Sequence, residues 1–157
     1  MLLTELVERA NKSLDNLLQT IENIPPGNMA IPESIGRWSV KDVLNHIIIW
    51  EEEAAKAFEI WKIGIEPDWL HITDLDEFNN STVEKRRKIP LSKIMEQLQL
   101  VHNGVIENIK SVADSEYNSR GGIPGWLKTL ITTHINEHTN RIEIFKCSLQ
   151  EVEQGSA

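Results

Sequence analysis

The amino-acid sequence predicts an all-α protein, a four-helix bundle with one additional short helix. Apolar residues recur at helical spacing along nearly the whole chain, and proline and glycine interrupt this pattern between the helical segments. No segment alternates apolar and polar residues as a half-buried strand would. Four long amphipathic segments with short or medium connections are typical of a bundle.

The first two long helices have clear boundaries in the sequence. The first is expected over residues 3–23, where apolar residues follow the three-and-four spacing, and Pro25-Pro26-Gly27 ends it. The second is expected over residues 40–62, because Ser39 and Asp42 have the spacing of a capping box at its start.

A short helix should follow, capped by Thr73 or Asp74 and leading into the basic run 85–88. We interpret this run as a solvated helix end rather than a nucleic-acid surface, because acidic residues precede it and cations complement the helix dipole. The third long helix should cover about 91–109, although Gly104 within it costs about 1 kcal/mol relative to alanine.

The last third of the chain should contain a loop and one more long helix. Residues 112–125 are polar and then rich in glycine and proline, which predicts a loop. The final helix is expected over 126–150, followed by a frayed tail at 151–157. We therefore expect one domain, residues 1–157, because this length suits a single core.

Composition excludes several classes of partner. The chain has 16 Lys and Arg against 24 Asp and Glu, a net charge of −8, which disfavours nucleic acid and anionic membranes. No apolar run approaches the ~20 residues of a membrane span, and no basic segment precedes an apolar stretch at the N-terminus. With one cysteine, Cys147, an intramolecular disulfide is excluded, so we expect a cytoplasmic protein.

Three histidines are expected on inward faces of the bundle. His134 and His138 lie four residues apart in the middle of the apolar stripe of the last helix, so both rings project from one face. His46 lies on the apolar face of the second helix. Buried imidazoles are costly without partners, and one divalent ion such as Zn²⁺, Ni²⁺ or Fe²⁺ would supply a partner for all three. Three ligands also leave a position for water or substrate.

Other arrangements of the histidines remain open at this point. The three could pack in the core without metal, and His102, on the apolar stripe of its own helix, is a competing ligand. His71 is expected in an exposed loop. Cys147 projects about 220° from His134 around the last helix, so we reject it as a ligand or nucleophile.

Two segments resemble signatures of the DinB-like superfamily. Residues 38–47, Trp-Ser-Val-Lys-Asp-Val-Leu-Asn-His-Ile, are similar to its second-helix signature, and residues 134–142, His-Ile-Asn-Glu-His-Thr-Asn-Arg-Ile, to its last-helix signature. The segment 76–79, Asp-Glu-Phe-Asn, resembles the branch related to the colibactin self-protection protein. The resemblance implies a four-helix bundle with a three-histidine metal centre. By position its ligands are His46, His134 and His138, which favours them over His102.

The resemblance also implies a range of functions. Members of the superfamily include S-transferases and isomerases that use low-molecular-weight thiols, and many form dimers. The leading hypothesis is a homodimeric, metal-dependent enzyme of thiol-transferase or hydrolase type, acting on a small-molecule substrate and possessing a divalent metal and a thiol as cofactors. The alternatives are a non-catalytic protein that sequesters a small molecule or toxin, and a dimeric bundle of unknown function.

Several side chains near the expected ligands are candidates for supporting roles. Glu137 and Arg141 lie one turn from the histidines of the last helix, and Glu53 lies two turns past His46. A solvated helix edge is the alternative for each of them. Trp50 is expected to line the pocket or the core. Asn79 is expected to form a hydrogen bond near the site, with a helix cap or exposure to solvent as the alternatives.

Overall fold

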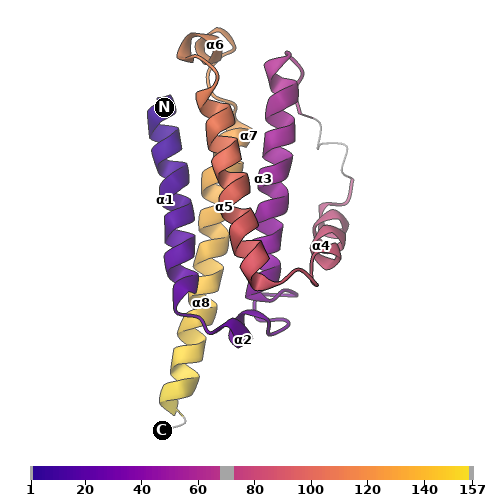
Figure 1. Ribbon diagram of the computed structural model, residues 1–157, viewed down its shortest axis with the longest axis vertical. Coiled ribbons are helices and arrows are strands. Elements are labelled where there is room, and N and C mark those ends of the chain that lie inside the picture. Colours follow the sequence, from indigo (N-terminus) through magenta and orange to yellow (C-terminus); the bar gives the residue numbers. More distant parts are fainter. Residues whose placement is uncertain (1, 68–72, 156–157) are drawn as a thin grey trace.

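The structure, a computed structural model, describes residues 2–67 and 73–155. Its long helices are α1 (Leu3–Glu22), α3 (Val40–Lys62), α5 (Leu91–Lys110) and α8 (His134–Gly155) (Figure 1). The helices α1 and α8 run in one direction along the long axis, and α3 and α5 run in the other. Packing is most extensive between α3 and α5 and between α1 and α8. The prediction of an all-α bundle is confirmed.

Short helices occupy several of the connections. They are α2 (Pro26–Met29), α4 (Leu75–Lys85), α6 (Asp114–Ser119) and α7 (Gly125–Lys128), and a π-helix, η2 (Thr129–Thr133), joins α7 to α8. The prediction named only the helix that corresponds to α4, and it assigned residues 112–125 to a loop. Helices of four to six residues, as α2 and α6 are, span too few turns to show an apolar period.

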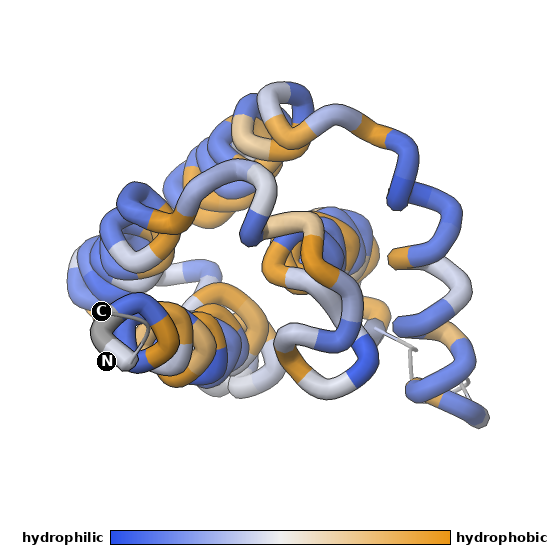
Figure 2. The backbone as a smooth tube through the Cα atoms, turned by 90° about the horizontal axis from the view of Figure 1, so that it is seen from below, coloured by the Kyte–Doolittle hydropathy of each residue, from blue (hydrophilic) through white to orange (hydrophobic). Residues whose placement is uncertain are grey.

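The core consists of two apolar clusters, one toward each end of the bundle. Figure 2 shows the apolar positions gathered along the inner sides of the long helices. On α1, α3 and α5 the two clusters are separated by a short gap, which lies for example between Ala10 and Leu14 on α1 and between Leu98 and Val105 on α5. Buried polar side chains occupy that gap, and His134 begins α8 at the same level, between Ile131 and Ile135.

The helix starts follow the expected local chemistry. The Ser39 side chain accepts a hydrogen bond from the Asp42 backbone N–H at 3.1 Å, and Asp42 Oδ2 accepts one from the Ser39 N–H at 3.1 Å, which completes the capping box of α3. Asp74 rather than Thr73 caps α4, because its Oδ1 accepts from the Glu77 N–H at 3.0 Å.

The basic run after α4 is not simply a solvated helix end, so this interpretation was wrong in part. Arg86 donates from Nε to Asn45 Oδ1 at 2.9 Å, and Arg87 Nε lies 3.3 Å from Asp42 Oδ1. Lys41 in turn donates to the Arg87 carbonyl at 3.0 Å. These contacts fasten the end of α4 to the first turns of α3, where buried polar groups of α3 require partners.

The last helix is longer than expected. It continues to Gly155, so the segment expected as a frayed tail is helical over most of its length, and Figure 1 shows its end extending below the other helices. Residues 146–154 contain good helix formers and no proline or glycine, which explains the extension. Among the described residues, no helix is both long enough and apolar enough to cross a membrane. The expected loop histidine, His71, lies outside the described residues.

Candidate metal centre

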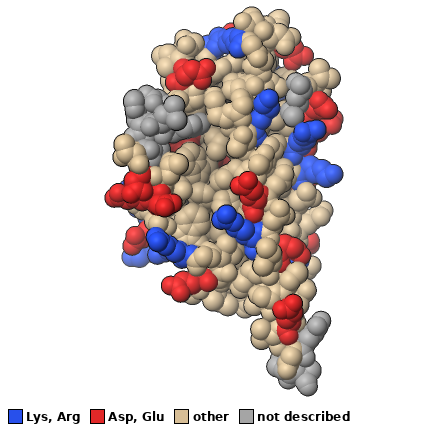
Figure 3. Space-filling view, turned by 180° about the vertical axis from the view of Figure 1, so that it is seen from behind, with Lys and Arg blue, Asp and Glu red and all other residues tan. Residues whose placement is uncertain are grey.

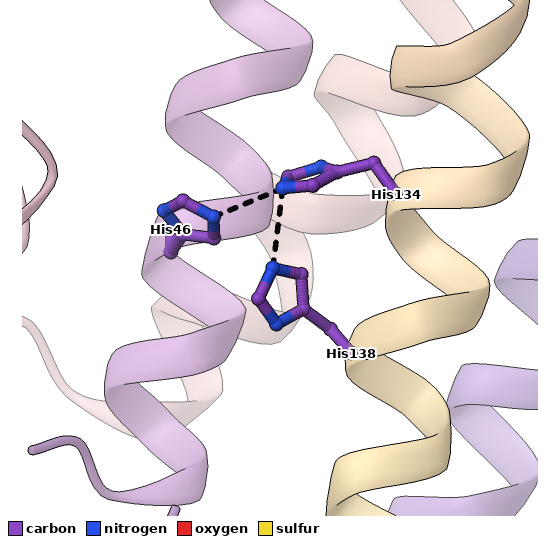
Figure 4. A group of neighbouring side chains, drawn as sticks. All are labelled: His46, His134 and His138. Carbon is purple, nitrogen blue, oxygen red and sulfur yellow. Dashed lines mark hydrogen bonds between the residues drawn. The ribbon is translucent and has the colours of Figure 1, made fainter. Parts of the chain in front are cut away.

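Three histidine rings from two helices converge inside the bundle (Figure 4). His46 comes from the second turn of α3, and His134 and His138 come from the first two turns of α8. His134 Nε2 lies 2.9 Å from His46 Nε2 and 3.1 Å from His138 Nε2. One nitrogen from each ring falls within 4.8 Å of the others, so the three could hold a metal ion. The structure thus brings together the three residues that the sequence pointed to.

Local structure explains how these rings come to face one another. The i,i+4 spacing places His134 and His138 one above the other on α8, and their rings are perpendicular at 4.7 Å between centroids. The π-helix η2 ends immediately before His134. Isolated π turns are frequent at functional sites, because the extra residue changes which side chains face inward.

Burial keeps the three imidazoles neutral. The pKa of His46 is lowered from 6.5 to about 2, mainly by burial and further by the charges of His138, His134 and Arg141. Burial is also the largest cause for His138, whose pKa falls to about 3, and for His134, whose pKa falls to about 4. Neutral imidazole is the form that binds a metal ion, so the triad is in a ligating state at neutral pH.

The hydrogen-bonding needs of the triad fit a bound cation. A neutral imidazole nitrogen carries either one N–H or one lone pair, so His134 Nε2 pairs well with only one of the two nitrogens that face it. The three Nδ1 atoms are buried and have no hydrogen-bond partner among the described residues. A cation among the Nε2 atoms would accept a lone pair from each. In tetrahedral zinc sites, with Zn–N bonds of about 2.0–2.1 Å, ligand nitrogens lie about 3.3 Å apart, which is close to the 2.9 and 3.1 Å that separate His134 Nε2 from the other two nitrogens.

Two indole rings near the triad are held by adjacent asparagines of α4, and one of them lies against His46. The Trp38 ring lies 4.8 Å from the His46 ring, between centroids, and its Nε1–H donates to Asn80 Oδ1 at 3.1 Å. Trp50, one turn past His46, donates to Asn79 Oδ1 at 2.8 Å. The sequence had singled out Trp50 and Asn79, and the structure pairs them with each other.

The other candidate supporting residues lie in different surroundings. Glu53 is half-buried and pairs with Lys56 at 3.1 Å. Glu137 is exposed on α8. Arg141 is also exposed, and its charge contributes, after burial, to the lowered pKa values of all three histidines. Of these residues, Arg141 is the one whose charge acts on the triad.

His102 belongs to a separate buried cluster and does not join the triad. Its Nδ1 lies 2.8 Å from Glu51 Oε1, and its Nε2 lies 3.1 Å from Asn11 Oδ1, so both ring nitrogens have partners. The ring and the Glu51 side chain are 1% exposed. Cys147 is exposed, consistent with its rejection as a ligand.

Sequence reasoning did not identify Asn80, Trp38 or Asn11 as partners of these sites. Trp38 and Asn80 are 42 positions apart, and Asn11 and His102 are 91 positions apart. Helical periodicity shows which face a residue occupies, but it carries no information about a partner on another helix. The two consecutive asparagines of α4 were the available signal, because unpaired amides are costly in partly buried positions.

Comparison with known protein families gives a clear assignment. The sequence profile of the DinB superfamily matches residues 9–142. The chain belongs to the DinB superfamily. Searches of curated proteins and of solved structures returned no match. Proteins of the DinB superfamily typically bind metal, and in this chain the buried histidine triad is the group that could hold one.

Proposed function

We propose that this DinB superfamily protein is a metal-dependent enzyme for a small-molecule substrate, of thiol-transferase or hydrolase type. The observation that supports this most directly is the convergence of three buried imidazole nitrogens, two of them 2.9 and 3.1 Å from the third. An all-imidazole set with three ligands is typical of catalytic rather than structural zinc sites, which usually have four protein ligands.

The residues of the chain would divide the work at this centre. His46, His134 and His138 would hold a divalent ion such as zinc, nickel or iron. When bound, the ion supplies a Lewis acid that favours the ionised form of a water or a thiol. The Trp38 indole covers one side of the His46 ring and limits the access of water to it. The hydrogen bond from Trp38 to Asn80 holds the indole in this position.

Metal analysis of protein prepared without a histidine tag tests the first part of this proposal. We expect about one divalent ion per chain and a rise in melting temperature on adding Zn²⁺ or Ni²⁺, because an ion that binds only the folded state stabilises it. His134→Ala should abolish tight binding. The matched control is His102→Ala, which should keep its metal. Full metal content in His134→Ala would show that the ligand assignment is wrong.

Turnover tests the second part of the proposal, that the protein is an enzyme. The metal-loaded protein is mixed with a low-molecular-weight thiol and an electrophile such as monochlorobimane, and conjugate formation is compared between wild type and His134→Ala. We expect turnover in the wild type and none in His134→Ala. Metal binding with no turnover across several thiols would favour the alternative, a protein that sequesters a small molecule. Light scattering addresses the accompanying proposal, drawn from the family resemblance, that the chain forms a homodimer.

A further inference from the structure

The charge of the candidate metal centre is not balanced by its ligands. The group that could hold an ion consists of three histidines and, within the described residues, includes no carboxylate or thiolate. Imidazole ligates in its neutral form, so a divalent ion there would keep its full double charge. A double charge in a buried site is costly unless an anion lies nearby.

Arg141 adds a further positive charge beside the same group. It follows His138 by three residues on α8, and residues at this spacing are neighbours on one helix face. Its guanidinium is charged at any physiological pH. The field of this charge reaches the triad, since after burial it is one cause of the lowered pKa of His134 and His138.

Within the part of the chain that the structure describes, no ion pair neutralises Arg141. Glu137, four residues before it, has the spacing of a helical ion pair, yet no carboxylate of the described chain lies within 4.0 Å of the Arg141 guanidinium nitrogens. The side chain is exposed, so its donors are accessible to a molecule from solution. A guanidinium offers a planar set of donors that matches a carboxylate.

We propose that Arg141 is a specificity-determining residue that binds the carboxylate of an anionic thiol whose sulfur reaches the metal centre. This inference rests on the proposed metal centre and deepens it by naming the class of ligand. The carboxylate and the ionised sulfur together supply the negative charge that the ligand set lacks. A neutral thiol of similar size would satisfy the metal centre but leave Arg141 without a partner.

Binding to cobalt-loaded protein tests this without relying on turnover. Thiolate ligation of Co²⁺ produces absorption in the near ultraviolet, so dissociation constants can be titrated for 3-mercaptopropionate and for the neutral 2-mercaptoethanol. We expect the wild type to prefer 3-mercaptopropionate by about tenfold, which corresponds to about 1.4 kcal/mol, near the lower end for a hydrogen bond to a charged group. In Arg141→Met the ratio of the two dissociation constants should fall to about one.

Lys146→Met is the matched control. It removes the same charge from the same helix, but Lys146 faces the C-terminal end of α1, where Asn23 and Ile24 lie near it, and not the triad. The preference should therefore persist in this variant. Equal affinity for the two thiols in the wild type, or an unchanged preference in Arg141→Met, would overturn the inference while leaving the metal centre intact. A wild type that binds no Co²⁺ would overturn both proposals.

Discussion

Each buried histidine needs partners for two ring nitrogens, and this chain meets the need in two ways. His102 finds both partners within the protein, in Glu51 and Asn11. The histidines of the triad point one nitrogen at each other and leave Nδ1 without a partner among the described residues. The first arrangement is complete without a ligand, whereas the second becomes favourable when a cation accepts the three converging lone pairs.

Replacing His102 should therefore affect stability and not metal binding. His102→Ala leaves the Glu51 carboxylate, 1% exposed, without the partner that lies 2.8 Å from its Oε1. Losing one member of such a buried pair costs about 3 kcal/mol or more. Urea unfolding with and without one equivalent of Zn²⁺ measures both effects. A loss below about 1 kcal/mol, or a loss of metal, would contradict this division of roles.

The sequence could show the faces of these histidines but not their partners. Helical projection placed His46, His134, His138 and His102 on apolar stripes, and all four are buried or half-buried. Periodicity could not separate His102 from the triad, because the difference lies in Glu51 and Asn11 on two other helices. Only the family resemblance favoured the three that converge.

Among the helices, the junction of η2 and α8 departs furthest from the expected pattern. A regular helix from residue 126 onward predicts that Leu130 shares the stripe of His134, yet Leu130 is only half-buried. Leu127 and Ile131 are fully buried instead. At 100° per residue, Leu127, Ile131 and Ile135 span only about 80° of a regular helix, so their common face follows the regular period, and what that period does not anticipate is the π turn of η2 itself.

At the scale of the whole molecule, the charged side chains of the surface and the polar side chains of the interior occupy different regions. Figure 3 shows acidic and basic side chains interspersed over one face, where water screens them. Among the buried polar residues, Ser13, Glu51 and His102 lie between the two apolar clusters of the core, and His134 of the triad begins α8 at the same level. In the pH range where the carboxylates stay ionised, the stability of the protein should therefore depend on pH mainly through the three histidines of the triad, whose pKa values are lowered.

Acidification should destabilise the metal-free protein before its carboxylates titrate. The histidines of the triad have pKa values lowered from 6.5 to about 2, 4 and 3 in the folded state, chiefly by burial. Below pH 6.5 the unfolded chain therefore binds protons that the folded chain does not, so stability is complete above 6.5 and declines toward pH 4. At pH 5 the loss is about 2 kcal/mol for each histidine that stays neutral. Urea unfolding in EDTA between pH 7 and 5 measures this slope, which should shrink in His138→Gln. A flat profile would mean that the three rings are hydrated and titrate normally.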